Sequence, residues 1–321
     1  MFPITSSRSK IIVTGSLAFD SIMDFPGRFA DHILPDKIHL LNLSFTVGTL
    51  KKQFGGTAGN IAYNLALLGE KPVIIGAAGH DFTDYRAHLK KAGVETSKIC
   101  IYRNTPTASF FVVTDLADNQ IGGFYPGPME KDLPVDFSAW KQKPELLIIA
   151  ANNPSLMVRL AAASRREKIP FIFDPAQQVI RLSKTELLSG LRGAKILIGN
   201  DYEMELIQSK TGLAKRELLR FVSALITTKG EKGSLIEVSG KSYEIPPAKP
   251  RAVVDPTGAG DAYRAGLILG LINGWPWEKT GRAASLSAVY AVEKYGTQKH
   301  RYTYKDFRRR FRQNFGCQLE E

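Results

Sequence analysis

Short, continuous apolar runs separated by helical patterns constrain the fold of this chain more than any other feature of its sequence. In the second half such runs occupy residues 146–150, 171–174, 196–199 and 225–228, and helical patterns occupy residues 154–167, 202–208 and 215–222. Strands that are apolar on both sides and alternate with helices are typical of a parallel sheet covered on both faces. We therefore predict an α/β fold, built on a doubly wound, mostly parallel sheet with helices on both faces.

The first third follows this alternation only in part. Residues 11–15 and 72–77 indicate strands, and residues 58–68 between them indicate a helix. By contrast, residues 38–50 read as extended chain, and three short β-rich runs occupy residues 99–102, 108–114 and 120–124. We interpret these segments as a small antiparallel sheet that projects from a single domain spanning residues 1–321. Two insertions, at about 36–52 and 99–126, would form it. Such a sheet can close over a site as a lid and exclude water, or it can be a static surface feature.

Composition excludes several classes of protein. Cys100 and Cys317 are the two cysteines, far apart and without metal-type spacing, which predicts a reducing cytoplasm and no structural metal. Residues 1–10 are short and polar, unlike a signal peptide. The longest apolar stretch, residues 265–272, contains Gly266 and Gly270 and is too short to span a bilayer. We therefore expect a cytoplasmic protein with no membrane partner.

The formal net charge is +12, and part of it lies near the end of the chain, at Lys305, Arg308, Arg309, Arg310 and Arg312. A basic segment of this kind can bind nucleic acid, but a solvated terminal helix is the simpler explanation and the one that we favour. A basic surface also suits an enzyme whose substrates are polyanions, because it raises encounter rates. We expect no nucleic-acid partner.

The segment from Val254 to Tyr263 carries the clearest chemical information. The residues Gly258, Ala259 and Gly260 leave their backbone amides unobstructed at the start of an apolar helix, where amides can hold an anion. A carboxylate beside an anion site is unfavourable for binding alone, and an Asp here could simply cap the helix. Asp261 is explained better as the group that takes a proton from a hydroxyl attacking a phosphate. The pattern indicates a kinase that acts on an alcohol.

Further polar and glycine residues follow other strands of the predicted sheet. Ligands of doubly wound sheets bind outside the carboxyl ends of the strands, so these residues would share one site. They are Asp20 after the first strand, Gly55, Gly56 and Asn60 at a helix start, Asn200, Glu203, Thr228, Gly230 and Gly233, and residues 255–261 after a short strand at 252–254. A Walker A loop is absent, because Leu235 stands where the motif ending at Gly240-Lys241-Ser242 needs its first glycine.

Together these motifs resemble the ribokinase/PfkB family of carbohydrate and nucleoside kinases. The run from Asp255 to Asp261 is similar to the carboxyl-terminal signature of that family, Gly55-Gly56-x-x-x-Asn60 to its amino-terminal signature, and Asn200-Asp201-Tyr202-Glu203 to its Asn-x-x-Glu motif. Position 256 departs from the family, which usually has Thr or Ser there; Pro256 removes an amide donor but leaves the acid and the glycine turn intact. Segments 55–60, 122–127 and 261–266 look most like the adenosine-kinase-like nucleoside kinases.

The resemblance implies a role for each residue. Asp261 would be the general base, and the amides of Gly258, Ala259 and Gly260 would stabilise charge during transfer. The predicted acceptor-binding residues are Asp20, Gly55, Gly56 and Asn60, with Phe124 and Tyr125 either stacking on a base or packing the lid. The predicted ATP-binding residues are Asn200, Thr228, Gly230, Gly233, Gly258 and Gly260.

The family also implies metal ions. Glu203 would organise the waters of Mg²⁺, an ion that keeps several waters in protein sites. A monovalent cation, K⁺, beside the anion site is left open, with Asp255, Thr257, Ala291 and Gly296 at the matching positions. Arg264 can share the helix face of the base, where it would contact a phosphate, contact the acceptor or pack against the protein.

The predicted function is ATP-dependent phosphorylation of a hydroxymethyl group of a nucleoside, with adenosine favoured and purine salvage as the setting. A sugar kinase of the same family, acting on ribose, fructose or a sugar phosphate, is the alternative. A catalytically silent nucleoside- or nucleotide-binding regulator is a third possibility, against which Asp261 argues because a pure binder needs no base. A homodimer formed through the lid is also left open.

Overall fold

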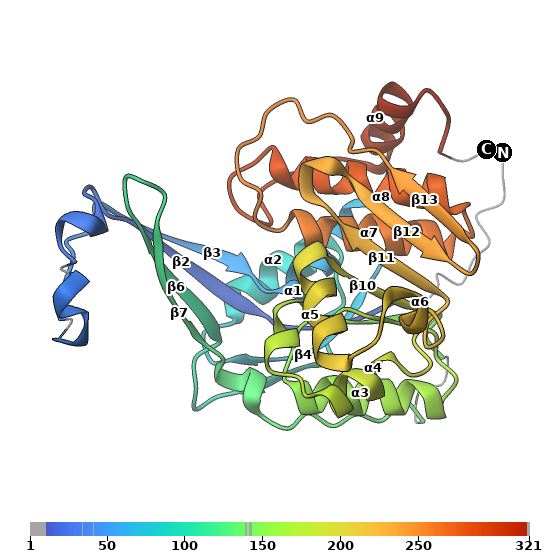
Figure 1. The fold of residues 1–321 in the computed structure, drawn as a ribbon, viewed down its shortest axis with the longest axis horizontal. Helices are drawn as coiled ribbons and strands as arrows, with labels where there is room; N and C mark the ends of the chain where they lie inside the picture. Colours follow the sequence, from blue (N-terminus) through green and yellow to red (C-terminus); the bar gives the residue numbers. More distant parts are fainter. Residues whose placement is uncertain (1–10, 34, 41, 139, 141–142, 320–321) are drawn as a thin grey trace.

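The computed structural model describes residues 11–33, 35–40, 42–138, 140 and 143–319. Residues 1–10, on which the expectation of no signal peptide rests, lie outside these described residues. Figure 1 shows a large sheet layered with helices and a second, smaller sheet that projects from it. Within the described part of the chain, no helix combines the length and the apolar character needed to cross a membrane.

Over the described residues, the large sheet has nine strands in the order β13-β12-β11-β10-β9-β8-β1-β4-β5. All neighbours pair in parallel except β12 and β13, which run antiparallel at one edge. The strands are β1 (Ile11–Thr14), β4 (Val73–Gly79), β5 (Ile99–Tyr102), β8 (Leu146–Ile149), β9 (Phe171–Phe173), β10 (Ile196–Asn200), β11 (Ala224–Thr228), β12 (Ser234–Val238) and β13 (Lys241–Ile245). The central strands β1, β8 and β9 are buried along their whole length, which confirms the prediction of a covered, mostly parallel sheet.

Helices cover both faces of this sheet. They are α1 (Thr57–Leu67), α2 (Thr83–Ala92), α3 (Pro154–Arg166), α4 (Lys184–Leu191), α5 (Asp201–Thr211), α6 (Lys215–Leu218), α7 (Ala259–Ile272), α8 (Trp277–Val292) and α9 (Tyr304–Phe315). Side chains alternate along a strand, so Ile11 and Val13 of β1 join one core with residues of α1, α2, α7, α8 and α9, whereas Ile12 joins the other core with α3, α4, α5 and α6. The sheet is therefore packed against a hydrophobic core on each face.

The smaller sheet consists of β2 (Ala18–Asp24), β3 (Thr49–Gly55), β6 (Ala108–Thr114) and β7 (Gln120–Tyr125), in the order β3-β2-β6-β7. Its two outer pairs are antiparallel, and the central pair, β2 with β6, is parallel. At its far end Phe25, Phe29 and Phe45 pack together, with ring centroids 4.6 to 5.7 Å apart. This aromatic cluster gives the projecting sheet a small core of its own.

Three predicted segments are corrected by the structure. Strand β5 pairs in parallel with β4, with Gly76 opposite Ile99, so residues 99–102 belong to the large sheet and not to the small one. Residues 38–50 are not extended throughout, because Pro35–Leu40 is a 3-10 helix and β3 begins at Thr49. Residues 252–254 form no strand; the N–H groups of Val254 and Asp255 donate to the Val292 carbonyl, at 2.9 and 3.1 Å, so the end of α8 holds this segment.

Candidate active site

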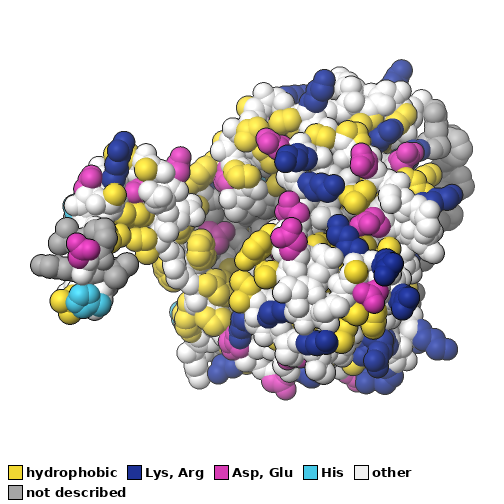
Figure 2. All heavy atoms as spheres, viewed as in Figure 1, with side chains coloured by type: hydrophobic (Ala, Val, Ile, Leu, Met, Phe, Trp, Pro, Cys, Tyr) yellow, Lys and Arg dark blue, Asp and Glu magenta, His cyan; other side chains and the backbone are white. Residues whose placement is uncertain are grey.

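A cavity of about 670 Å³ lies between the two sheets, at the carboxyl ends of the parallel strands. Figure 2 shows the surface hollowed between the projecting sheet and the main body. Most of the predicted site residues line this cavity: Asp20, Gly56, Asn60, Phe124, Asn200, Glu203, Thr228, Gly230, Thr257, Gly258, Gly260 and Asp261. These residues therefore lie together, as we predicted from the rule that ligands of doubly wound sheets bind at the carboxyl ends of the strands.

The glycine turn before α7 presents backbone amides to the cavity. Gly258 has φ +79°, the left-handed conformation that favours glycine, and no side chain caps the helix. A Cβ atom at Gly258 would lie 3.0 Å from the Thr297 Cβ, so the position also lacks space. The Ala259 N–H donates to the Pro256 carbonyl at 3.1 Å. Of the three predicted anion-binding amides, those of Gly258 and Gly260 therefore remain available at the cavity wall.

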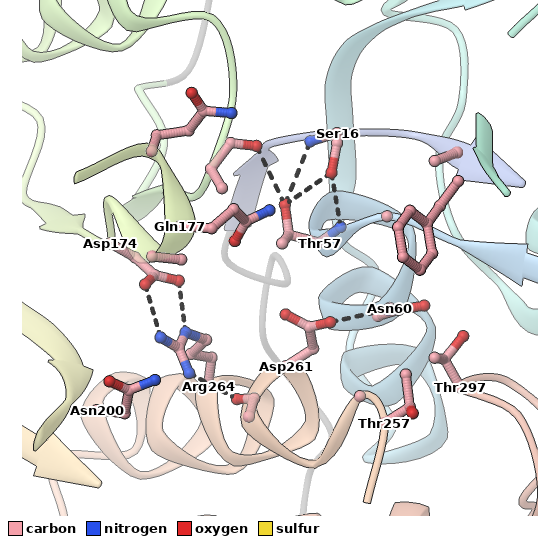
Figure 3. Close-up of a pocket in the computed structure, with 18 of the residues that line it drawn as sticks. Ser16, Thr57, Asn60, Asp174, Gln177, Asn200, Thr257, Asp261, Arg264 and Thr297 are labelled. Atoms are coloured by element: carbon pink, nitrogen blue, oxygen red, sulfur yellow. Dashed lines mark hydrogen bonds and ion pairs between the residues drawn. The ribbon is translucent and has the colours of Figure 1, made fainter. Parts of the chain in front are cut away.

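Asp261 lies in the first turn of α7, beside these amides. Its Oδ2 accepts a hydrogen bond of 2.8 Å from Asn60 Nδ2, so α1 and α7 meet at this carboxylate (Figure 3). Burial raises the pKa of Asp261 to about 7, and the nearby Asp174 and Asp20 add to this rise, whereas Arg264 and the Asn60 hydrogen bond oppose it. A carboxyl whose pKa lies near neutral pH is suited to accept and release a proton.

A hydrogen-bond network that sequence reasoning missed holds Asn60 from behind. Gln298 Nε2 donates to Asn60 Oδ1 at 2.9 Å and to Tyr85 Oη at 2.5 Å, and Tyr85 Oη donates to the Gly55 carbonyl at 2.8 Å. Because Asn60 Oδ1 accepts from Gln298, the amide NH₂ of Asn60 is the group directed at Asp261. The network is tightly packed: a Cβ atom at Gly59 would lie 1.8 Å from Tyr85 Oη.

Asp20 lies within β2 of the small sheet and not directly after β1 as predicted. Its carboxylate packs against Gly55, where a Cβ atom would lie 2.2 Å from Oδ2, so only glycine fits. Gly56, with φ +86°, is equally confined, since its Cβ atom would lie 2.5 Å from the Ser16 carbonyl oxygen. Burial raises the pKa of Asp20 to about 6, and Asp255 contributes to the rise. The two glycines thus allow a carboxylate to lie against the backbone at the cavity wall.

Arg264, whose role the sequence left open, is buried and paired with Asp174. Arg264 Nε donates to Asp174 Oδ2 at 2.5 Å and Nη2 donates to Oδ1 at 2.7 Å (Figure 3). Both residues line the cavity. Asp174 was not predicted as a site residue, although it directly follows β9 and shares the strand-end position of the residues that were.

Asn200 and Glu203 line another part of the cavity and cap α5 reciprocally. Asn200 Oδ1 accepts from the Glu203 N–H at 2.7 Å, and Glu203 Oε2 accepts from the Asn200 N–H at 2.8 Å. Burial raises the pKa of Glu203. Gly233 does not line the cavity: a Cβ atom there would lie 2.1 Å from the Ile245 carbonyl oxygen, so this glycine serves the turn before β12.

The positions predicted for a monovalent cation gather around Asp255. Its Oδ1 accepts from the Thr257 N–H and its Oδ2 from the Gly296 N–H, each at 2.9 Å. The Ala291 carbonyl accepts from the Lys294 N–H at 3.2 Å. The structure thus brings Asp255, Thr257 and Gly296 together beside the glycine turn, while the carbonyl of Ala291 is used within the end of α8.

Phe124 and Tyr125 of β7 lie apart. Phe124 lines the cavity with Phe110 and Met129, whereas Tyr125 Oη hydrogen-bonds to Thr105 Oγ1 at 2.8 Å, outside the cavity. Side chains of neighbouring strand residues point to opposite faces, which explains the separation. Other cavity residues that sequence reasoning missed are Ser16, Thr57, Gln177, Gln178 and Thr297.

The charged side chains of the cavity are unbalanced. Among the described residues that line it are four acids, Asp20, Asp174, Glu203 and Asp261, and one base, Arg264. No group of three or more His, Cys, Asp or Glu side chains arranged to hold a metal ion occurs among the described residues. A metal ion carried in with a phosphate ligand would fit this lining, since it needs few direct protein ligands.

Comparisons with known proteins agree with the fold. A family model described as pfkB family carbohydrate kinase matches residues 16–302. The curated nucleoside kinase of Methanocaldococcus jannaschii is 31% identical over 294 residues, covering 90% of this chain and 92% of its own. Its crystal structure, described as an archaeal member of the ribokinase family, superposes with a TM-score of 0.85 at 30% identity, covering 95% of this chain and 98% of that one.

A second similar structure is the nucleoside kinase of Burkholderia thailandensis. Its complex with inosine superposes with a TM-score of 0.86 at 35% identity, covering 96% of this chain and 99% of that one. Its complex described as ADP-inosine superposes with a TM-score of 0.84 at 36% identity, covering 96% of this chain and 97% of that one. Both comparisons match the large sheet and the projecting sheet, because they extend over nearly the whole chain.

Proposed function

The chain belongs to the pfkB family of carbohydrate kinases, and from this we propose that it transfers the γ-phosphate of ATP to a hydroxymethyl group of a nucleoside. One observation carries the proposal: Asp261, oriented by Asn60, lies in the same cavity as the available amides of Gly258 and Gly260 at the start of α7. The similarity to nucleoside kinases, one of them bound to inosine, supports a nucleoside acceptor. Adenosine, giving AMP, is the first candidate from the sequence, and inosine is the second.

In the proposed reaction Asp261 accepts the proton of the acceptor hydroxyl. At the same time, the oxygen of that hydroxyl forms a bond to the γ-phosphorus. The bond between that phosphorus and the β–γ bridging oxygen breaks, and ADP leaves with the electron pair. The amides of Gly258 and Gly260 would stabilise the negative charge that builds on the transferring group. Asn60 would keep the Asp261 carboxylate directed at the hydroxyl.

The sugar of the acceptor would lie between the small sheet and α1. Asp20, pressed against Gly55, would accept hydrogen bonds from two sugar hydroxyls, and the bare backbone at Gly55 and Gly56 allows the ring to come close. Phe124, together with Phe110 and Met129, offers an apolar wall for the base. Closure of the small sheet over the acceptor would exclude water from the γ-phosphate.

The triphosphate would lie along Asn200, Thr228 and Gly230, toward the glycine turn. Glu203 would hold the waters of Mg²⁺, and only one of its two carboxylate oxygens is used in capping α5. Bound Mg²⁺ neutralises phosphate charge and makes the γ-phosphorus a better electrophile. Of the four positions considered for a K⁺ ion, Asp255, Thr257 and Gly296 lie together beside the turn and would hold it, whereas the Ala291 carbonyl would have to give up its hydrogen bond at the end of α8.

An acceptor comparison tests the proposal. ADP release should be measured with Mg²⁺ and ATP over adenosine, inosine, guanosine, cytidine, ribose and fructose 6-phosphate, with Asp261→Asn as the control for contaminating kinases. We expect a purine nucleoside to give the highest kcat/KM. A higher kcat/KM for fructose 6-phosphate than for every nucleoside would overturn the nucleoside assignment but not the family. If no acceptor gives ADP release, the proposal that the protein phosphorylates a nucleoside is wrong.

A further inference from the structure

The ion pair between Arg264 and Asp174 is buried and is joined by two hydrogen bonds. Arg264 is 6% exposed and Asp174 is fully buried. The two parallel hydrogen bonds, Nε to Oδ2 and Nη2 to Oδ1, match the fork of a guanidinium to the two oxygens of a carboxylate. The pair joins α7 to the end of β9, so it connects the helix that carries Asp261 to the large sheet.

The same guanidinium also holds the first turn of α7. Arg264 Nη1 donates to the Gly260 carbonyl at 3.0 Å, and Gly260 is the residue before Asp261. One side chain therefore contacts the anion-binding turn on one side and the sheet on the other. A shift of Arg264 would move the backbone at Gly260 and Asp261 together.

Stability does not explain why a charged pair occupies this place. Taking both charges out of water costs free energy that their attraction often fails to recover, and apolar residues of similar volume pack as well. Arg264 is, moreover, the one cation among the described residues that line a cavity with four acids. The position of the pair beside Asp261 therefore calls for an explanation in the chemistry of the site.

We propose that the Arg264–Asp174 pair is a positioning element for the reaction proposed above: it fixes the first turn of α7 and sets the charge environment of Asp261. Arg264 supplies a positive charge next to the proposed base, and Asp174 holds that charge in place and limits its effect. The inference rests on the proposed function, because it assigns these residues a role only through Asp261.

The electrostatics of Asp261 support this assignment. The groups that act on it are Arg264 on its own helix, Asp174 after β9, Asp20 on β2 and the Asn60 amide on α1, while its charge in turn acts on Tyr85 of α2. Arg264 lowers the pKa of Asp261, and Asp174 and Asp20 raise it. The two partners of one ion pair thus act on the base in opposite directions.

This opposition gives a sharp test with the full-length enzyme. A base works when deprotonated, so kcat/KM falls as pH drops through its pKa. Arg264→Met should raise that pKa and move the acid limb of the pH profile of kcat/KM upward, by about one pH unit. Asp174→Asn should move the limb downward. The neutral pair Arg264→Gln with Asp174→Asn should return the limb near its wild-type position, because the two contributions are removed together.

Arg264→Lys separates charge from geometry. It keeps the positive charge, so the limb should stay near that of the wild type, but it loses the forked pair and the Gly260 contact, so kcat should fall at every pH. Circular dichroism and thermal unfolding check that each variant is folded. If one single variant does not fold, the limb of the other single variant and the kcat of Arg264→Lys decide the matter.

The inference would be overturned if the limbs of Arg264→Met and Asp174→Asn move in the same direction, or if both limbs stay in place although these two variants are folded. An Arg264→Lys variant with unchanged kcat would overturn it too. Asp261→Asn separates this failure from failure of the proposed function. If Asp261→Asn keeps wild-type turnover, the base assignment itself is wrong; if it is inactive while the limbs do not move, only the role of the ion pair is wrong.

Discussion

At the scale of single residues, the surroundings of Asp261 keep its carboxyl close to the point where it changes charge. Burial raises its pKa to about 7, against a hydrogen bond from Asn60 that favours the charged form. A buried acid of this kind is costly to the fold once ionised. The same environment that suits the carboxyl to proton transfer therefore lowers the stability of the protein at neutral pH.

The substitution Asp261→Asn tests both consequences. The amide keeps the shape and can still accept the bond from Asn60, but it cannot take a proton, so kcat should fall by about two to four orders of magnitude. Calorimetric titration should show ATP and acceptor binding largely retained. Near-wild-type turnover would remove Asp261 from the mechanism.

The unfolding midpoint of the same variant gives an independent reading. The pKa of Asp261 is raised in the folded state, so the folded protein binds the proton more tightly than the unfolded chain and loses stability as pH rises between the two pKa values. Asp261→Asn should therefore raise the midpoint relative to wild type at pH 8 and have less effect at pH 5. A uniform change at both pH values would contradict the raised pKa.

The predicted residues that lie together in the cavity include two groups that short sequence motifs mark. Asp261 with its glycine turn and Asn60 with Gly55 and Gly56 are local patterns. Asp174, Tyr85 and Gln298 were missed because their partners lie 90, 213 and 238 residues away in the chain. Such contacts depend on how the elements pack, which no local pattern contains.

At the scale of elements, the alternation of side chains along β7 decides what the small sheet offers to a ligand. Phe124 points into the cavity and Tyr125 away from it, so one of the two predicted aromatic contacts is available. Strand periodicity could have distinguished them, had the register of β7 against β6 been known.

Truncation of Phe124 tests the contact with the base. Phe124→Ala should lower kcat/KM for the preferred nucleoside, because about 1–3 kcal/mol of stacking free energy is lost. It should change residual ribose activity much less, since ribose has no aromatic ring to stack. Phe111 is the matched control, because it is 48% exposed against 47% for Phe124, lies on the same sheet and does not line the cavity. Equal losses for nucleoside and ribose would contradict the stacking role.

Elements of the large sheet were predictable where strands are apolar on both faces, as in β8 through β11. Strand β5 was misassigned because a four-residue apolar run looks the same in either sheet, and only its pairing with β4 decides. Strand β3 carries Lys51 and Lys52 and is mostly exposed, so it lacks the apolar pattern that marks a strand.

At the scale of the whole molecule, the net charge is positive, whereas the charged side chains that line the cavity are mostly acidic. The chain carries a formal net charge of +12, and Figure 2 shows lysine and arginine spread over the visible surface. Among the residues that the structure describes, those with charged side chains lining the cavity are instead four acids and one arginine. The surface attracts a polyanion from a distance, whereas the site repels the same polyanion at close range unless a cation accompanies it.

Removal of divalent ions should therefore weaken binding as well as catalysis. With EDTA we expect ATP affinity to fall by about tenfold or more, equivalent to ~1.4 kcal/mol, and turnover to be lost. Titration with Mg²⁺ should restore both, while the affinity for an uncharged nucleoside should not change. ATP binding of equal strength with and without Mg²⁺ would contradict the role given to the acidic lining.

The close approach of Gly59 to the Tyr85 hydroxyl bears on how this site can change over evolutionary time. With Oη 1.8 Å and Cζ 2.9 Å from where a Cβ would stand, position 59 is closed to every other residue while the tyrosine keeps its place. A lineage must first lose the hydroxyl and let the ring move, giving up the bonds to Gly55 and Gln298. Once alanine has been fixed at 59, the tyrosine can no longer return. The order of substitutions at positions 59 and 85 therefore decides which later sequences are compatible with the fold.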